Sequence, residues 1–263
     1  MTWPTYRNRY LPALDLEAIG SIPDKAHSPV ILPIGAVEQH GPHLPVGVDA
    51  LVAQARLDYA LPRLPEDLPV WVAPPIQIGK SNEHTGFPGT LMVSKTVLRR
   101  QILAIARQLH EWGFRCLLIL NTHGGNIQVI RYTIPEIERE LGMSVHRLSF
   151  SSGLELDEQE AAYGFHAGEI ETAIMLEILD GKAIEMEHAT CEFPASIQDP
   201  GRLRPEAAPA IYSWVTSDLS QSGVMGDARA ATRERGRAWL DGESGSLARQ
   251  IARICASLKE GSG

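Results

Sequence analysis

Acidic and imidazole side chains gather in the segment VEQHGPHLPVGVD, residues 37–49, which holds few residues that could build a core. Glu38 and His40 are two residues apart, so on an extended backbone their side chains point the same way. Asp49 opens the helical pattern DALVAQARLDYAL, where its plain structural role would be that of an N-cap. Because carboxylates and imidazoles without sulfur suit Zn²⁺ or Mn²⁺, the segment is a candidate metal site.

A second polar segment, NTHGGN, residues 121–126, lies between the most regular predicted strand and a helix. Ligands of open α/β sheets bind at the carboxyl ends of strands, which is where this segment falls. Gly124 and Gly125 let the backbone approach a bound group, and the helix start offers free N–H donors, so these glycines and Asn126 are candidate substrate-binding residues. His123 is a candidate metal ligand, and the alternative is a turn histidine that only satisfies backbone groups.

A largely buried helix with acids in its first turn is predicted by FHAGEIETAIMLEIL, residues 165–179. The helix dipole favours carboxylates there, so ordinary capping explains one of Glu169 and Glu171. Glu171 shares its side of the helix with Ile174 and Met175, and we expect it to face inward, where a carboxylate needs a cation as its partner. Capping does not explain His166 at the same helix start.

Glu83 and His84 lie in a fourth segment, GKSNEHTGFPGT, residues 79–90, which again follows a predicted strand. The glycines and the proline of this segment predict a loop. Both side chains are candidate substrate-binding residues, but the favoured interpretation for each is a solvated loop.

Together these segments supply five candidate metal ligands, three carboxylates and two imidazoles: Glu38, His40, Asp49, His123 and Glu171. One tetrahedral ion needs fewer ligands, whereas two ions about 3.5–4 Å apart would use all of them if Asp49 bridged. We therefore expect one or two Zn²⁺ or Mn²⁺ ions per chain. Such a centre activates a water molecule and polarises a carbonyl, and His166, which the ligand set does not need, would protonate the leaving nitrogen or oxygen.

The elements that must position these segments alternate between apolar strands and amphipathic helices. Apolar runs predict strands at residues 28–35, 70–79, 114–121 and 144–150. One helix is predicted from Ser94, as N-cap, to Gly113, and another from Asn126 to Gly142, with Pro135 expected to kink or divide it. Residues 191–222 are predicted to be loops and residues 228–258 mostly helical. A βαβ series of this kind predicts a mostly parallel sheet with helices on both faces.

Composition bounds the class of protein. A chain of 263 residues with 44% hydrophobic content can bury one substantial core, and we expect a single domain over residues 1–263. The net charge of -8, with no long run of Lys or Arg, argues against nucleic acid as a main partner. Cysteines outside any CxxC pair, and apolar runs too short to cross a bilayer, indicate a cytoplasmic protein without a membrane partner.

The ordered blocks EQHGPHLPVGVDA, EHTGFPGT, NTHGGN and HAGEIET resemble the creatininase (creatinine amidohydrolase) family, and GVMGDARAATRERG resembles its carboxyl-terminal segment. The resemblance implies a three-layer α/β/α domain with a dinuclear metal centre that hydrolyses a cyclic amide, a formamide or another non-peptide C–N bond of a small polar substrate. It also implies a homo-oligomer such as a hexamer. By motif, His166 takes the position of the family's catalytic histidine, and the metal ligands are Glu38, His40, Asp49, His123 and Glu171.

The third block departs from creatininases proper, which resemble His-Tyr-Glu where this chain has His123, Gly124 and Gly125. An aromatic substrate contact and an acidic residue of the metal site are therefore missing, which argues against creatinine as the substrate. One ligand is then replaced by water or by Glu169. The His-Gly-Gly form resembles a broader group that includes deformylases of flavin-type cofactor biosynthesis, a peptidase that trims a redox-cofactor precursor, and hydrolases of keto-inositols.

Two other functions are compatible with the same residues. The centre could hydrolyse a lactone or a cyclic ketone, or the chain could be a metal-stabilised binding protein that performs no chemistry. A nucleotide-binding module is disfavoured, because the sequence lacks the GxGxxG and GxxxxGK[ST] arrangements that cradle phosphates.

Overall fold

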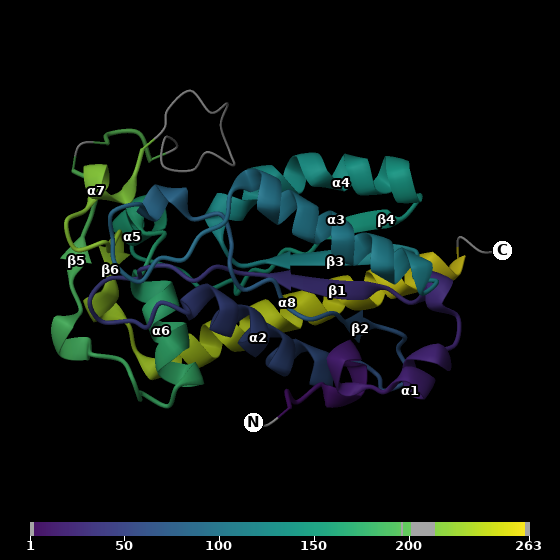
Figure 1. Cartoon of the computed structure of the whole chain (residues 1–263). Helices are drawn as coiled ribbons and strands as arrows, with labels where there is room; N and C mark the ends of the chain where they lie inside the picture. The colour runs from purple at the N-terminus through teal and green to yellow at the C-terminus, as the bar shows by residue number, and fades with distance from the viewer. Residues whose placement is uncertain (1–2, 196, 201–213, 261–263) are drawn as a thin grey trace.

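Strands and helices alternate along the chain in the computed structural model, which describes residues 3–195, 197–200 and 214–260 (Figure 1). The first part contains α1 (Leu16–Gly20), β1 (Val30–Ile34), α2 (Val48–Ala60), β2 (Trp71–Val72), α3 (Lys95–Glu111), β3 (Cys116–Asn121), α4 (Ile127–Leu141) and β4 (Ser144–Arg147). The second part contains α5 (Glu158–Tyr163), α6 (Glu169–Ile178), β5 (Cys191–Glu192), α7 (Thr216–Leu219), β6 (Gly226–Asp227) and α8 (Arg233–Glu260). Short 3-10 helices lie between them: η1 (Arg7–Arg9), η2 (Leu11–Ala13), η3 (Lys25–His27), η4 (Leu61–Arg63), η5 (Asn82–His84), η6 (Gly124–Asn126), η7 (Met186–His188) and η9 (Ala228–Ala230).

The strands pair in the order β2, β1, β3, β4, and each pair is parallel. β1 pairs with β3 along its whole length, from Val30 opposite Leu117 to Ile34 opposite Asn121. Every residue of β1 is buried, as expected for a strand that is covered on both faces. The predicted parallel sheet is therefore confirmed.

Helices cover both faces of this sheet (Figure 1). On one face, α3 and α4 pack against strand residues such as Leu32 and Ile119. On the other face, α2 and α8 pack against the intervening residues, such as Ile31 and Leu118. Because successive residues of a strand point to opposite faces, one continuous apolar run contributes to both cores. The architecture is the three-layer α/β/α fold that the resemblance implied.

Two strands are shorter than the apolar runs that predict them. Of residues 70–79, only Trp71 and Val72 form β2, because Pro74 and Pro75 have no N–H to donate to the ladder. Of residues 144–150, regular pairing covers only the first four, in β4.

The predicted helix boundaries agree with the structure. Ser94 caps α3 by accepting a hydrogen bond from the Val97 N–H at 3.3 Å, and Gly142 ends α4 with a φ of 62°. The helix α4 runs through Pro135 without a break, so it is not divided there.

The last third of the chain also follows the prediction in outline. Residues 228–258 form η9 and α8, as expected for a mostly helical end. The segment 191–222, predicted to be loops, contains the short elements β5 and α7, while residues 196 and 201–213 lie outside the described residues.

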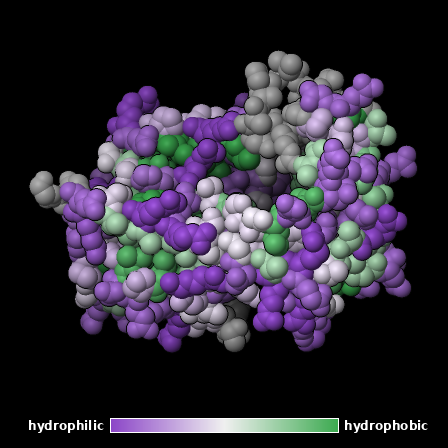
Figure 2. Space-filling view, turned by 180° about the vertical axis from the view of Figure 1, so that it is seen from behind, coloured by the Kyte–Doolittle hydropathy of each residue, from purple (hydrophilic) through white to green (hydrophobic). Residues whose placement is uncertain are grey.

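The face of the molecule seen in Figure 2 is mainly hydrophilic, and its apolar residues form separate patches. In the part of the chain that the structure describes, no helix combines the length and the apolar character needed to span a membrane.

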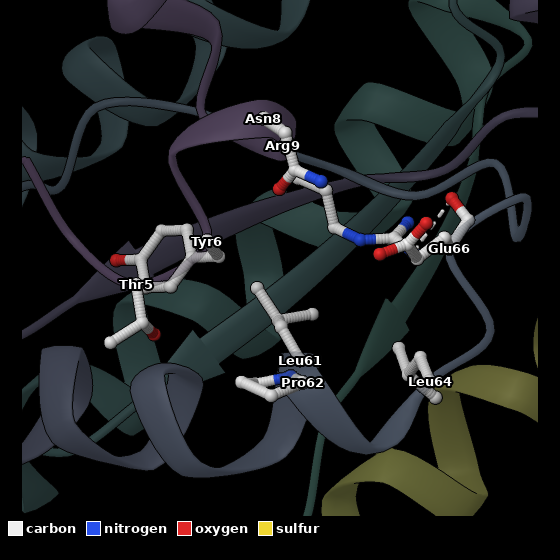
Figure 3. A pocket seen from close by; sticks show the side chains of 8 residues that line it. All are labelled: Thr5, Tyr6, Asn8, Arg9, Leu61, Pro62, Leu64 and Glu66. Carbon is white, nitrogen blue, oxygen red and sulfur yellow. Dashed lines mark hydrogen bonds between the residues drawn. The ribbon is translucent and has the colours of Figure 1, made fainter.

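A pocket of about 230 Å³ lies between the N-terminal segment and the turn after α2 (Figure 3). The buried guanidinium of Arg9 at this pocket donates to the main-chain carbonyls of Pro65 and Val70, at 2.5 and 3.4 Å. These bonds tie the N-terminal segment to the loop that precedes β2, so Arg9 has a structural role.

The helices α6 and α8 approach each other closely at Gly236. A Cβ atom at position 236 would overlap the carbonyl oxygen of Ala173 in α6. Since α6 also carries Glu171, this contact fixes one of the elements that position the candidate ligands.

We expect Gly236→Ala to lower the free energy of unfolding by about 1–3 kcal/mol, because the added methyl group forces α8 away from α6. Gly245→Ala in the same helix is the matched control, since its Cβ would lie 3.4 Å from the mobile ends of Arg63 and Arg249. The control is expected to be neutral or to stabilise by up to about 1 kcal/mol through helix propensity. Urea unfolding of both variants checks this, and equal stabilities would contradict the role of the close contact.

Candidate metal centre

The predicted ligands come together beyond the carboxyl ends of β1 and β3. Glu38 and His40 follow β1, and His123 follows β3. Asp49 lies in the first turn of α2 and Glu171 in the first turn of α6. Figure 1 shows α5, α6 and the β5–β6 pair at the end of the molecule toward which β1 and β3 point. Loops and helix starts from four parts of the chain therefore build one site.

Short distances connect these side chains. His123 Nδ1 lies 3.2 Å from Glu38 Oε1 and 3.4 Å from Asp49 Oδ2. His40 Nε2 lies 3.8 Å from Asp49 Oδ1 and 3.7 Å from Glu171 Oε2. In the group of Glu38, His40 and Asp49, one ligand atom from each residue lies within 4.8 Å of the others. The structure thus brings together every side chain in the predicted ligand set.

Asp49 does not cap α2, which corrects the plain structural interpretation of this residue. The N-cap is Gly47, and the Asp49 side chain is 3% exposed. Its main-chain carbonyl accepts a hydrogen bond from Thr122 Oγ1 at 2.8 Å. This bond ties the start of α2 to the loop after β3, and so holds the Asp49 carboxylate close to His123.

Glu169 and Glu171 have different partners. Glu169 is the more buried of the two and forms an ion pair with Arg235 of α8. Glu171 keeps 26% of its side chain exposed, turns Oε2 toward His40, and accepts a hydrogen bond from the Ala167 N–H at 2.6 Å. The predicted acid therefore lies at the site, but the expected reason, deeper burial, is wrong.

His84 and Glu83 are not solvated, which corrects the favoured interpretation of their loop. His84 is 3% exposed, and its Nε2 lies 3.2 Å from Glu38 Oε1. Glu83 is largely buried, with Oε1 at 3.2 Å from His123 Nε2. The composition of residues 79–90 is polar and rich in turn residues, which indicates exposure. The sequence also contained a signal for burial at the site: these two ionisable residues follow a strand directly, as the ionisable residues of the first and third blocks do.

Gln39 was not among the predicted site residues, although it holds several of them. Its Oε1 accepts a hydrogen bond from the Gly41 N–H at 2.9 Å, and its Nε2 donates to the Gly223 carbonyl at 3.1 Å. With the amide oriented in this way, Nε2 also donates to His84 Nδ1 at 2.9 Å. Gln39 was missed because a glutamine has no titratable group. Its place between Glu38 and His40 was the one sequence signal that could have predicted its role at the site.

The hydrogen-bond partners of each imidazole assign its proton to one nitrogen. His40 Nδ1 donates to the Glu38 main-chain carbonyl at 3.0 Å, so its Nε2 faces the cluster with a lone pair. His166 Nε2 donates to the Gln39 carbonyl at 2.8 Å, so its Nδ1 faces Glu38 with a lone pair at 3.8 Å. His84 is different: because its Nδ1 accepts from Gln39, its Nε2–H is the donor to Glu38. In this arrangement His84 supports the carboxylate, and ligand atoms of Glu38, His84 and His166 also lie within 4.8 Å of one another.

Burial and nearby charges shift the pKa values of the cluster. Burial alone would raise the pKa of Glu38, but the ion pair and hydrogen bond with His123 hold it well below its usual value. Burial opposes the charge of His123, yet Glu38 raises the pKa of His123 well above its usual value. Burial and the charge of Glu38 together raise the pKa of Asp49. Burial lowers the pKa of His40 to about 4. The pKa shifts of Glu38, His123 and Asp49 thus come from one another's charges as well as from burial.

Three ligand atoms of the cluster are buried without a hydrogen-bond partner among the described residues: Glu38 Oε2, His40 Nε2 and Asp49 Oδ2. Buried polar atoms are nearly always paired, and leaving one unpaired costs about 1–3 kcal/mol. A divalent cation would satisfy oxygen and nitrogen lone pairs that point into the same space. The residues present therefore fit Zn²⁺ or Mn²⁺.

His43 and Asn126 lie next to the cluster and hold its framework. His43 Nε2 pairs with Thr172 Oγ1 of α6 at 2.8 Å. The Asn126 side chain donates to the Gly35 carbonyl at 3.0 Å and accepts from the Lys80 N–H at 2.9 Å, so it links the loops that follow β1, β2 and β3. Substrate binding by Asn126 stays a prediction.

Named hydrolases are similar to this chain over most of its length. The chain is 30% identical over 209 residues to the mycofactocin precursor peptide peptidase of Mycolicibacterium smegmatis, with 79% of this chain and 77% of that protein covered. It is 28% identical over 236 residues to the creatinine amidohydrolase of Pseudomonas putida, with 81% and 84% covered. A mutant creatininase of Zn-Zn type has the same fold, with a TM-score of 0.76 at 23% identity over 96% of this chain and 98% of that one.

The family assignment follows from a match that spans nearly all of the fold. Residues 14–251 match the family described as creatininase, creatinine amidohydrolase. This range includes the loops after β1, β2 and β3 and the starts of α2 and α6. The chain belongs to the creatininase family.

Proposed function

We propose that the chain is a metal-dependent amidohydrolase whose centre is formed by Glu38, His40, Asp49, His123 and Glu171. One observation carries the proposal: Glu38, His40 and Asp49 each bury a polar atom that has no partner among the described residues, and ligand atoms of these three residues lie within 4.8 Å of one another. Membership of the creatininase family favours hydrolysis over a purely structural metal site.

The proposed metal is Zn²⁺ or Mn²⁺, with two ions per chain when the centre is full. Asp49 would help to hold such ions on two sides, since Oδ1 lies toward His40 and Oδ2 toward His123. The similar creatininase structure of Zn-Zn type agrees with this stoichiometry. A divalent ion at such a site lowers the pKa of a water molecule and polarises the carbonyl that the water attacks.

His166 is the proposed acid–base residue. Burial, with a further contribution from His40 and His84, lowers the pKa of His166 to about 3, so the ring is neutral at pH 7. The ring lies between those two imidazoles, with centroid distances of 4.3 Å to each, and its Nε2 is held by the Gln39 carbonyl. Nδ1 is then the atom that accepts a proton and passes it to the leaving nitrogen.

The proposed substrate is a small polar amide, and peptide amides are included. The sequence predicted a non-peptide C–N bond, but one relative is named as a peptidase of a precursor peptide. The exposed Gly124 has no atom within 4 Å of the place where a Cβ would stand, so a substrate can approach the main chain beside His123. Creatinine is disfavoured because no aromatic residue stands at position 124. We further propose a homo-oligomer, as the family resemblance implies, and a cytoplasmic location, as the cysteine pattern of the sequence predicts.

The function is tested on purified protein by elemental analysis and a substrate panel. The panel contains short peptides, formamides, cyclic amides, lactones and cyclic ketones. We expect amide hydrolysis that stops after chelation and returns with Zn²⁺ or Mn²⁺. Turnover of lactones or ketones alone would replace the proposal with the alternative hydrolase, and stoichiometric metal without any turnover would favour a binding protein.

We expect His123→Ala to lower metal content and thermal stability together, because an ion that binds only the folded state stabilises it by mass action. Metal content is measured by elemental analysis, and the melting temperature is measured with and without added Zn²⁺. The control is His146→Ala, at an exposed position on β4, which should leave both quantities unchanged. Wild-type metal stoichiometry in His123→Ala would remove this residue from the ligand set.

His166→Ala is expected to keep its metal and to lower kcat by about 10²–10⁴-fold, the range that general acid–base residues contribute. Metal content and single-turnover rates separate the two effects. His188→Ala, at an exposed histidine, serves as the control. Loss of the metal together with turnover would make His166 a ligand instead of the proton carrier.

A further inference from the structure

Glu83 reaches the candidate centre from the loop after β2, although it is not one of the predicted metal ligands. Its carboxylate lies beside His123, with Oε1 at 3.2 Å from Nε2. Its other oxygen, Oε2, lies 3.2 Å from Lys80 Nζ. The side chain of Glu83 is 14% exposed, so both contacts are shielded from solvent.

These contacts determine how the His123 ring faces the centre. Nε2 has acceptors around it, namely Glu83 Oε1 and the Lys80 carbonyl at 3.0 Å, so Nε2 carries the hydrogen. In the metal-free chain Nδ1–H of the cationic ring faces Glu38 and Asp49, and loss of this proton to a metal would leave the Nδ1 lone pair in the same direction. A histidine that ligates a metal through one nitrogen usually donates its other N–H to a carboxylate or a carbonyl, which fixes the ring and makes it a stronger ligand.

Lys80 keeps Glu83 on the outer side of the ring. Its ammonium neutralises the carboxylate through Oε2, while Oε1 remains as the acceptor for His123. A carboxylate paired in this way adds no further negative charge to a cluster that already holds Glu38 and Asp49. The contact pattern fits a group that orients a ligand better than it fits another ligand.

The space that the Glu83 carboxylate occupies exists because residue 125 is glycine. A Cβ atom at position 125 would overlap Glu83 Oε1 and would also crowd the Lys80 carbonyl and His123 Nε2. A Cβ atom at the neighbouring position 124 would have no other atom within 4 Å. The two glycines of the block are therefore not equivalent: Glu83, the Lys80 carbonyl and His123 leave no room for a side chain at position 125, whereas position 124 is open.

We propose that Glu83 is a positioning residue of the metal centre, which holds His123 with Nδ1 facing the metal, and that Gly125 lacks a side chain in order to seat it. The proposal rests on the proposed metal-dependent function. The carboxylate of Glu83, which comes from the loop after β2, would thus occupy the space that a side chain at position 125 would need. Positions 83 and 125 act as one unit, although they are 42 positions apart in the chain.

The test is calorimetric titration of the metal-free protein with Zn²⁺ at fixed pH, so the readout is metal affinity and not turnover. Glu83→Ala and Gly125→Ala are each expected to weaken binding by about 10–100-fold, the usual cost of losing such a partner. Glu83→Gln keeps an oxygen acceptor for His123 and should lose less. Gly124→Ala is the matched control and should bind Zn²⁺ like the wild type.

The double variant Glu83→Ala/Gly125→Ala tests whether the two positions form a unit. Because the methyl group would displace Glu83 and would also crowd His123 directly, the double variant should lose less affinity than the sum of the two single losses. Nitrogen-15 NMR of the Zn²⁺-loaded protein should show protonated Nε2 on His123 in the wild type and a mixture of ring states in Glu83→Ala. Circular dichroism of every metal-free variant verifies folding.

Several outcomes would overturn the proposal. Wild-type Zn²⁺ affinity in Glu83→Ala, equal losses in Gly124→Ala and Gly125→Ala, or fully additive losses would each contradict it while leaving the metal centre intact. A wild-type protein that binds neither Zn²⁺ nor Mn²⁺ would instead overturn the proposed function, and this inference with it.

Discussion

The carboxylate of Glu38 is the group on which the arrangement of the site depends. It is 1% exposed, and its Oε1 lies 3.2 Å both from His84 Nε2 and from His123 Nδ1. A carboxylate that is buried without partners becomes neutral, because desolvation penalises its charged form. The two imidazoles come from the loops after β2 and β3. Keeping Glu38 charged therefore requires both loops to close over the loop after β1, and the same closure brings the other ligands together.

The order of the strands makes this closure possible. In the sheet β2-β1-β3-β4, the strand β1 lies between β2 and β3, and all of these strands run in the same direction. The loop after β1 thus has a neighbour on each side at the carboxyl edge, which is where open α/β sheets place their ligands. Asn126 reinforces the contact by bonding to the main chain of both Gly35 and Lys80. The topology of the sheet, rather than the separation of the residues along the chain, determines which side chains meet.

Much of the fold and most of the site could be predicted from the sequence, because buried parallel strands are continuous apolar runs and because the ionisable residues follow them directly. The predictions failed where the sequence signal was local and the cause was not. Asp49 has the residue type and position of an N-cap, but its side chain lies in the cluster, next to His123 of the loop after β3. His84 sits in a polar loop, and its burial comes from Gln39 and Glu38, which are distant in the sequence. Helical periodicity placed Glu171 at the site but could not reveal that Arg235 of α8 buries Glu169 more deeply.

The orientation of the imidazoles also has a source that no pattern of side chains encodes. His40 and His166 each donate a proton to a main-chain carbonyl of the segment after β1, and His123 lies 3.0 Å from the Lys80 carbonyl. Because the acceptors of His40 and His166 belong to the backbone, the lone pairs of these two rings face inward without a bound metal, and little reorganisation would be needed for one to bind. The cost is a cluster of unpaired buried atoms, which destabilises the folded chain. The divalent ion of the proposed centre would offset that cost. One partner would then meet two requirements at this site, preorganised ligands for chemistry and satisfied polar atoms for the fold.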